Sequence, residues 1–156
     1  MTKEKFSELV LECEATLYRI SMSMLKNESD CEDAVQTAIL TAFEKLSTLK
    51  KEEFFKTWLV RILINVCNKQ LKNRSRIVGM DEAGYGAKEP SVPSPVNNTE
   101  IRLALEKLPL KYRNVIVLYY IEGFSISEIK KIILTPEGTI KSRLSKGRSL
   151  LRQYLE

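Results

Sequence analysis

A helical pattern with basic and apolar side chains on separate faces fills residues 136–155, and it constrains the fold more than any other part of the chain. Its cations are Lys141, Arg143, Lys146, Arg148 and Arg152, and no acidic residue lies between Glu137 and Glu156. Its apolar face consists of Ile140, Leu144, Leu151 and Leu155. A shorter helical stretch, residues 125–134, precedes it with only a tight turn between. Two helices joined by a short turn, the second of them basic, are typical of a DNA-binding helix-turn-helix.

Residues that begin and end helices support this interpretation. Ser125 and Glu128 form a capping box at the start of the first helix. Thr135 is a suitable N-cap for the second helix, with Pro136 at its first position. An earlier amphipathic helix ends at Gly123, and its apolar residues are Tyr112, Val115, Ile116, Leu118 and Tyr119. The alternative is a basic, solvated helix that only closes a helical bundle.

The charge of the chain is positive overall and unevenly distributed. The formal net charge is +5 and the pI is about 9.1, which favours an anionic partner. Residues 1–50 carry 6 basic and 9 acidic side chains, whereas residues 54–80 carry six basic side chains and no acidic one. Two basic stretches, near residues 54–80 and 136–155, are therefore set against an acidic first third.

Cysteine and histidine usage argues against metal and disulfide chemistry. The three cysteines, Cys13, Cys31 and Cys67, are far apart, and the chain has no histidine. This pattern argues against a zinc site and a disulfide framework, and it fits a reducing cytoplasm. No segment is apolar enough to predict a signal peptide or a membrane span. An enzyme has little support, because no phosphate-binding glycine loop or metal-ligand cluster is present.

The sequence predicts an all-α protein with two small helical domains joined by a flexible linker. Residues 77–98 hold three of the six glycines and three of the five prolines, and they show no helical or strand period. This composition is typical of a linker, although a lid or functional loop is the alternative. We therefore expect one domain at residues 1–76 and another at residues 99–156.

Helical periodicity predicts three or four helices before residue 77. Ser29 and Glu32 predict a capping box at the start of the second helix. The apolar stripe of the third helix consists of Phe55, Trp58, Leu59, Ile62, Leu63 and Val66. No alternating strand pattern or hairpin turn is present.

The order of the motifs resembles that of an extracytoplasmic-function sigma factor. The first half carries Asp30, Asp33, Gln36, Phe43, Trp58, Arg61 and Asn65. The second half carries Leu108, Pro109, Tyr112, Arg113, Gly123, Glu128, Ile129 and the stretch 138–144. Members of this family are the smallest bacterial sigma factors, with only sigma domains two and four. The resemblance covers nearly the whole chain apart from the linker.

The resemblance implies that Asp30, Asp33 and Gln36 lie on a domain-two helix that docks on the clamp helices of the largest polymerase subunit. Asp30 and Asp33 also have a local interpretation, because the helix dipole favours acids in a first turn. Position 37, usually acidic in the family, is Thr37 here.

The resemblance further implies a promoter-melting helix with Trp58 and Asn65, and a loop at residues 47–53 that captures a flipped base of the minus-ten element. Trp58 shares a stripe with Phe55 and Ile62, which favours a core position over a base-stacking platform. Asn65 is either a satisfied amide in the core or a contact to DNA. The cations expected to bind phosphates are Arg61, Lys69, Lys72, Arg74 and Arg76.

In domain four the resemblance implies a recognition helix that reads the minus-thirty-five element in the major groove. Its contacts would be Thr139, Lys141, Ser142, Arg143 and Lys146, while Arg113 would touch the DNA backbone. At 100° per residue, Thr139, Arg143 and Lys146 should form the groove-facing row, with Lys141 or Ser142 on a flanking base or phosphate. Lys130 replaces the usual alanine, and Leu134 and Thr135 occupy the turn where the family usually has glycine.

The expected function is that of a cytoplasmic sigma factor, which binds core RNA polymerase and recognises and opens promoter DNA. It is not an enzyme and uses no cofactor, metal or small-molecule substrate. The resemblance also implies an anti-sigma factor as partner, often a membrane-anchored one. The alternative is a free-standing helix-turn-helix transcriptional regulator, which would bind duplex DNA tightly without polymerase, usually as a dimer on a palindrome.

Overall fold

The computed structural model describes residues 1–78 and 99–156, and helices are the regular secondary structure within these two ranges. The chain forms two compact units, Met1–Val92 and Pro93–Glu156. The prediction of an all-α protein with two helical domains is confirmed. The predicted linker at residues 77–98 lies outside the described residues, except that Ile77 and Val78 end a helix. No described helix is long and apolar enough to cross a membrane.

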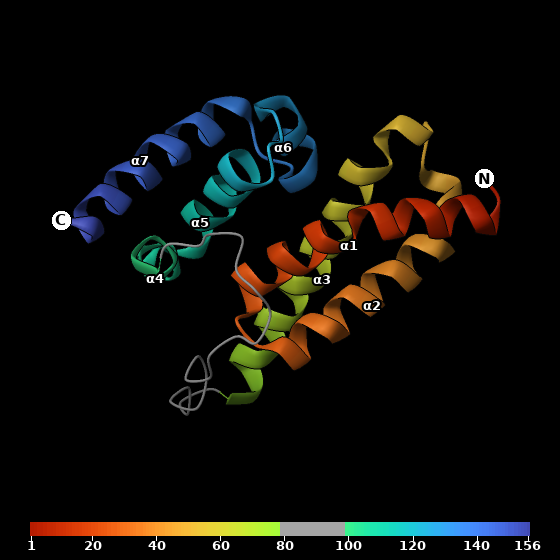
Figure 1. The fold of residues 1–156 in the computed structure, drawn as a ribbon, viewed down its shortest axis with the longest axis horizontal. Helices are drawn as coiled ribbons and strands as arrows, with labels where there is room; N and C mark the ends of the chain where they lie inside the picture. The colour runs from red at the N-terminus through yellow and green to blue at the C-terminus, as the bar shows by residue number, and fades with distance from the viewer. Residues whose placement is uncertain (79–98) are drawn as a thin grey trace. The chain divides into compact units, whose positions relative to one another are not determined.

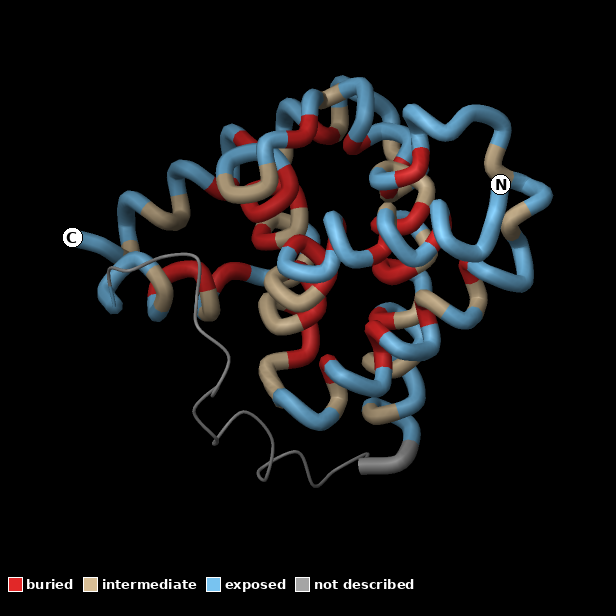
Figure 2. Tube along the Cα trace, turned by 45° about the vertical axis from the view of Figure 1, so that its right-hand side comes forward, coloured by how far each residue is buried: buried red, intermediate tan, exposed pale blue. Residues whose placement is uncertain are grey.

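The first unit is built from three long helices, α1 (Lys3–Leu25), α2 (Glu28–Glu44) and α3 (Phe55–Val78), each packed against the other two (Figure 1). Two short 3-10 turns, η1 (Leu46–Thr48) and η2 (Glu52–Phe54), connect α2 to α3. The buried segments of the helices face the interior of the unit (Figure 2). The largest fully buried side chains are Leu17, Ile20, Leu25, Val35, Leu59, Val60 and Leu63.

The junction between α1 and α2 differs from the predicted one. Lys26 adopts the left-handed conformation with φ 59°, and its N–H donates to the carbonyl oxygen of Met22. Asn27 then caps α2, because its Oδ1 accepts from the N–H of Asp30 at 3.0 Å. The predicted capping box at Ser29 is wrong, since Ser29 already lies in the first turn of α2.

The buried face of α3 is also rotated from the predicted stripe. Phe55, Leu59 and Leu63 are buried as expected, but Trp58, Ile62 and Val66 are only half-buried. Val60, Ile64 and Cys67 complete the core instead. The physical reason is that α3 packs against both α1 and α2 and therefore buries a wide face.

The second unit consists of α4 (Thr99–Lys107), α5 (Leu110–Ile116), a π-helical turn η4 (Val117–Ile121), α6 (Ile126–Ile133) and α7 (Glu137–Leu155). Helix α7 packs on α4, α5 and α6 (Figure 1). The largest fully buried side chains are Leu108, Leu118, Ile129, Ile132 and Ile140.

The π-helical turn changes which aromatic side chains are buried. The N–H of Glu122 donates to the carbonyl oxygen of Val117 at 2.9 Å, a bond that spans five residues. The wider turn buries Val117 and Leu118 and exposes Tyr119 and Tyr120. The prediction that Tyr119 belongs to an inward stripe is therefore wrong, because the π-helical turn departs from 3.6-residue periodicity.

Candidate nucleic-acid interface

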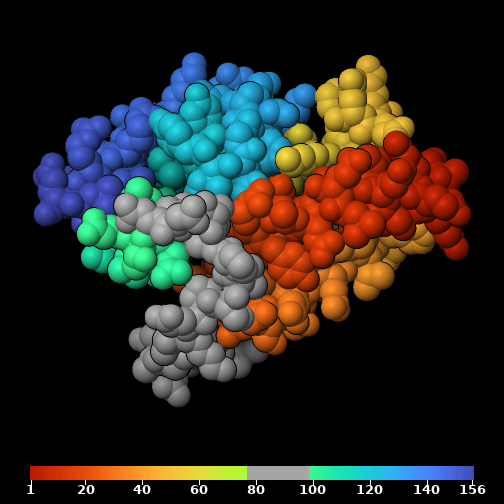
Figure 3. All heavy atoms as spheres, viewed as in Figure 1, coloured from red at the N-terminus to blue at the C-terminus, as the bar shows by residue number. Residues whose placement is uncertain are grey.

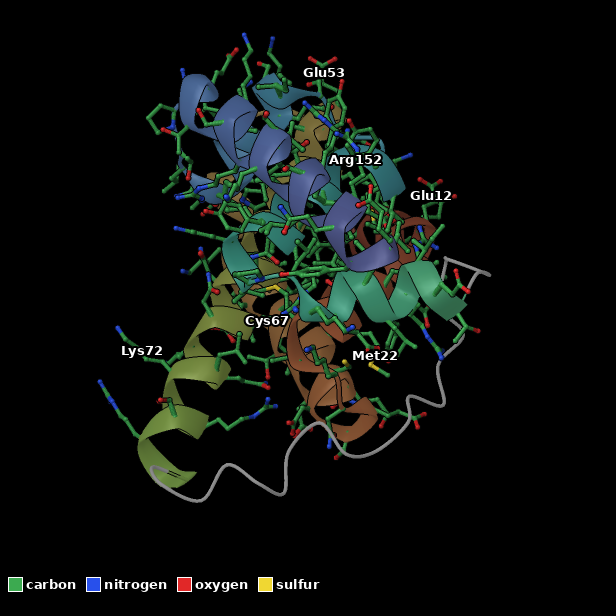
Figure 4. All side chains as sticks on the ribbon, turned by 90° about the vertical axis from the view of Figure 1, so that its left-hand side faces the viewer. Glu12, Met22, Glu53, Cys67, Lys72 and Arg152 are labelled. Carbon is green, nitrogen blue, oxygen red and sulfur yellow. The ribbon has the colours of Figure 1, made fainter. Side chains whose placement is uncertain are left out.

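One side of α3 carries a continuous stripe of polar and basic side chains, here called the α3 stripe. It consists of Arg61, Asn65, Lys69, Lys72 and Arg76, and all five residues are exposed. At 100° per residue these side chains lie within about 80° of one another, along roughly 22 Å of helix. Lys72 points away from the unit (Figure 4). The structure thus brings four of the five predicted phosphate-binding cations together with Asn65.

Arg74 is the exception, because it lies on the side of α3 that faces the other helices. It forms an ion pair with Asp30 through Nη2, and its Nη1 donates to the carbonyl oxygen of Leu25 at 3.4 Å. The Arg74 and Asp30 side chains are 22% and 35% exposed. The phosphate contact of Arg74 and the polymerase contact of Asp30 stay predictions, and the structure adds that these two partly exposed side chains are paired with each other.

Trp58 lies at the start of α3, half-buried and between two kinds of contact. Its ring centroid is 5.7 Å from that of Phe55, and its Nε1 donates to Thr48 Oγ1 at 3.2 Å. The core position favoured for Trp58 is thus only partly realised. Asn65 is exposed, so the alternative that made it a satisfied core amide is wrong.

The loop that contains Thr48, residues 45–54, has an exposed and mostly polar surface. Leu46 and Leu49 are its half-buried side chains. Figure 3 shows this part of the chain, in yellow, protruding from the first unit. The Nζ of Lys5 lies 3.4 Å from Glu52 Oε1, which links the loop to the start of α1. Neither the Lys5 contact nor the Trp58 bond could be inferred from sequence spacing, because both depend on how the helices pack.

The outer face of α2 carries the remaining predicted polymerase contacts. Asp33 and Gln36 are exposed and three residues apart, so they lie on the same side of the helix. Thr37 is exposed beside them, and Leu40 is 65% exposed on the same face. Periodicity alone could have indicated Leu40, which lies one turn after Gln36 and outside the buried stripe.

The helix-turn-helix of the second unit has the predicted first helix and a different turn. Ser125 and Glu128 form the capping box, with bonds of 3.1 Å and 2.9 Å. Leu134 ends α6 in the left-handed conformation. Thr135 is not the N-cap of α7, because its hydroxyl donates to the carbonyl oxygen of Ile133 and Pro136 occupies the cap position.

The predicted base and phosphate contacts all lie outside the buried face of α7. That face consists of Ile140, Leu144 and Gly147. Lys141, Ser142 and Lys146 are exposed, whereas Thr139 and Arg143 are half-buried. Helical geometry puts Thr139, Arg143 and Lys146 on one flank of the buried face, and Lys141 and Arg148 on the other flank. Arg148 donates to the hydroxyl of Tyr120 at 3.0 Å, a contact that the sequence did not predict.

Arg113 is buried, which argues against its predicted contact with the DNA backbone. It is 7% exposed, and its Nη1 donates to the carbonyl oxygens of Glu106 and Leu108 at 3.1 Å and 2.9 Å. Burial lowers the pKa of its guanidinium. These bonds satisfy carbonyl groups at the end of α4, which lack partners within the helix. Lys130, in contrast, is exposed on α6.

The cysteines contribute to packing. All three are buried, and Cys67 points into the first unit (Figure 4). Burial raises the pKa of the Cys67 thiol to about 12, so it stays protonated at neutral pH. Among the described residues, no three acidic, histidine or cysteine side chains gather in a way that could hold a metal ion.

Comparison with known proteins agrees with this division into two helical units. The family model "Sigma-70 region 2" matches residues 9–77, and the model "Sigma-70, region 4" matches residues 98–151. The ECF RNA polymerase sigma factor SigW of Bacillus subtilis (strain 168) is 30% identical over 168 residues, which cover 98% of this chain and 90% of SigW. The RNA polymerase sigma factor SigV of the same strain is 27% identical over 154 residues, covering 99% of this chain and 93% of SigV.

Solved structures show the same fold. The sigma factor RpoE of Bartonella quintana, solved with the anti-sigma factor NepR, superposes with a TM-score of 0.82 at 26% identity and 97% coverage of both chains. CnrH, solved with the cytosolic domain of CnrY, gives a TM-score of 0.72 at 22% identity, covers 99% of this chain and 89% of its own, and supports the fold alone.

A chain made of region 2 followed by region 4 has the domain organisation of a small sigma factor. This chain belongs to the extracytoplasmic-function sigma factors of RNA polymerase. Its function is to direct the polymerase to promoters. The region 2 match over residues 9–77 leaves the alternative of a free-standing regulator, with its N-terminal dimerisation or ligand domain, without support.

Proposed function

We propose that this sigma factor opens promoters through the α3 stripe and the adjacent loop, reads the minus-thirty-five element through α7, and binds core RNA polymerase through α2. The α3 stripe is the observation that carries the proposal. The corresponding domains are residues 1–76 and 99–156, joined by a linker at residues 77–98. We further propose that the protein is cytoplasmic, is not an enzyme, and needs no cofactor.

The α3 stripe combines the two properties that binding to an opened promoter requires. Four exposed cations along one helix face attract phosphates without regard to sequence. Asn65 lies among them with its amide exposed, so it can donate to and accept from an unpaired base. The loop of residues 45–54 protrudes beside the start of the same helix and offers hydroxyl and ammonium groups to a flipped base.

Helix α7 has side chains suited to the major groove of duplex DNA. Arg143 can donate two hydrogen bonds to guanine, and Thr139 and Lys146 flank it on the same side of the helix. Lys141 and Ser142, both exposed, would reach a flanking base or phosphate. Arg148 lies on the opposite flank, where its bond to Tyr120 fixes one end of its guanidinium. We therefore assign base reading to Arg143.

The proposed polymerase-binding face of α2 consists of Asp33, Gln36, Thr37 and Leu40. An exposed leucine between polar side chains gives such a face both apolar contact area and directional bonds. Asp30 supports this face indirectly, because its ion pair with Arg74 joins the start of α2 to the C-terminal part of α3.

An anti-sigma factor is the proposed regulatory partner. The similar RpoE of Bartonella quintana was solved with the anti-sigma factor NepR. A protein that covers α2 and α7 would compete with both polymerase and promoter. Added to holoenzyme assembly reactions, such a partner should reduce transcription from the cognate promoter.

In vitro transcription with core polymerase tests the proposed function directly. Asn65→Ala should impair opening of the minus-ten region more than it impairs binding of the closed duplex. Permanganate footprinting measures the opening. Asn73→Ala is the matched control, because Asn73 is an exposed asparagine of α3 outside the stripe. Normal opening by Asn65→Ala would remove Asn65 from the site. Tight, promoter-specific binding by the purified chain without polymerase would favour a free-standing regulator.

A further inference from the structure

The loop of residues 45–54 needs a defined conformation if it is to select one base, yet few interactions within the loop stabilise such a conformation. Its backbone bonds are local: the N–H of Thr48 donates to Lys45, that of Leu49 to Leu46, and that of Phe54 to Lys51. Each closes a single turn, and no side chain of η1 or η2 is buried. Isolated turns of this kind exchange between conformations unless contacts from outside hold them.

Trp58 provides such a contact from the rigid part of the unit. Its ring packs at 48° against Phe55, which is 2% exposed. Phe55 in turn meets the ring of Phe6 edge to face at 5.8 Å, and Phe6 meets Phe43 at 5.3 Å. The four rings come from α1, α2 and α3, so the indole is anchored to all three helices of the unit.

The other side of the indole is bonded to the loop. Trp58 Nε1 donates to Thr48 Oγ1 at 3.2 Å, and the same hydroxyl donates to the carbonyl oxygen of Lys45 at 2.7 Å. Thr48 therefore uses its proton within η1 and accepts the indole proton on a lone pair, which fixes its rotamer. The Lys5–Glu52 pair is a second contact, but its side chains are 46% and 53% exposed, where an ion pair contributes little.

We propose that Trp58 is a positioning residue that sets the conformation of the loop through Thr48, and thereby sets the base preference at the minus-ten element. The proposal rests on the function proposed above, in which the loop receives an unpaired base. It differs from the idea of Trp58 as a stacking platform, because here the ring acts through its contact with Phe55 and its bond to Thr48.

Three substitutions isolate this hydrogen bond. Trp58→Phe keeps an aromatic ring and removes the donor, Thr48→Val keeps the side-chain shape and removes the acceptor, and Thr48→Ser keeps the acceptor. Open-complex formation by reconstituted holoenzyme is measured over single-base variants of the minus-ten element. Trp58→Phe and Thr48→Val should each reduce the preference for the cognate base about threefold to tenfold, as expected for one lost hydrogen bond. The double variant should lose no more than either single variant, and Thr48→Ser should keep the preference.

A spectroscopic measurement checks the contact independently of DNA. Trp58 is the single tryptophan of the chain, so intrinsic fluorescence reports on this site alone. Thr48→Val should increase the quenching of Trp58 by acrylamide in the free protein, whereas Thr48→Ser and Lys5→Gln should leave it unchanged. Unchanged quenching in Thr48→Val would overturn the proposed contact.

Failure of the proposal and failure of the proposed function give different results. If replacement of residues 47–51 by glycines leaves the minus-ten preference intact, the loop does not read this element and the proposed function of the loop is wrong. If that replacement removes the preference but Trp58→Phe keeps it, or lowers opening equally on every promoter, the loop reads the base and the positioning role of Trp58 is overturned.

Discussion

At the scale of single residues, the turn between α6 and α7 contains one residue with an unfavourable backbone conformation. Leu134 has φ 50° and ψ 52°, a region that costs an ordinary L-residue about 1–2 kcal/mol. Its side chain is 67% exposed, so little packing offsets that cost. Helix α6 ends there because Pro136 cannot continue it, since proline has no N–H to donate to the carbonyl oxygen of Ile132.

Leu134→Gly should therefore stabilise the protein. Glycine removes the steric cost but loses more backbone entropy on folding, so we expect a net gain of about 0.5–1 kcal/mol. Lys130→Gly is the matched control, because it puts glycine into the exposed, right-handed interior of α6 and should cost about 0.5–1 kcal/mol. Urea unfolding followed by circular dichroism measures both. A loss of stability in Leu134→Gly would contradict the strain argument.

Gly147 illustrates a residue whose role the sequence did not indicate. A Cβ at Gly147 would lie 2.9 Å from Ile116 Cγ1 and 3.2 Å from its Cδ1. Gly147→Ala should therefore force α7 away from α5 and cost about 1–3 kcal/mol. Gly138→Ala is the control in the same helix, because nothing lies within 4 Å of its added Cβ; it should be neutral or stabilising by thermal unfolding. Equal effects of the two substitutions would show that the close approach is unimportant.

At the scale of helices, periodicity predicted which segments are helical better than which side faces inward. The capping box at Ser125 could be read from two residues three positions apart, because that interaction is local. The face of α3 could not, since its apolar residues form a broad band and packing against two helices selects the part that is buried. Arg74 could not be separated from the exposed cations of α3 for the same reason, because the sequence alone does not show which basic side chains pack against other helices.

The Asp30–Arg74 pair should stabilise the junction of the first unit. Its partly buried side chains and the added bond to the Leu25 carbonyl favour a measurable interaction. A double-mutant cycle with Asp30→Asn and Arg74→Gln should give a coupling energy of about 1 kcal/mol. The exposed Lys5–Glu52 pair is the control and should give less than about 0.5 kcal/mol. No measurable coupling between Asp30 and Arg74 would show that the pair does not stabilise this junction.

At the scale of the whole molecule, the order of two motifs predicted the protein class, although several local structural predictions were wrong. Fold class depends on the sum of many helical and apolar signals, so errors at Ser29, Thr135 or Tyr119 leave it unchanged. Site residues depend on which side chains remain exposed after packing, and neither the pairing of Asp30 with Arg74 nor the burial of Arg113 could be predicted from the sequence. The DNA-binding roles proposed for the two units are best separated by measuring holoenzyme rather than either unit alone.

Two substitutions should separate sequence-blind from sequence-specific binding in the holoenzyme. Lys72→Gln in the α3 stripe should weaken holoenzyme binding to all promoters about equally. It should also reduce the slope of log K, the logarithm of the binding constant, against log salt by about one, because one phosphate contact is lost. Arg143→Ala in α7 should cost about 1–3 kcal/mol on the cognate promoter and relax preference at one base of the minus-thirty-five element. Lys3→Gln, an exposed cation outside both sites, should change neither quantity. Measuring holoenzyme affinity for single-base promoter variants at two salt concentrations distinguishes these effects. A lost base contact lowers the affinity only for promoters that carry that base. A uniform loss of affinity for Arg143→Ala would therefore make Arg143 a phosphate contact.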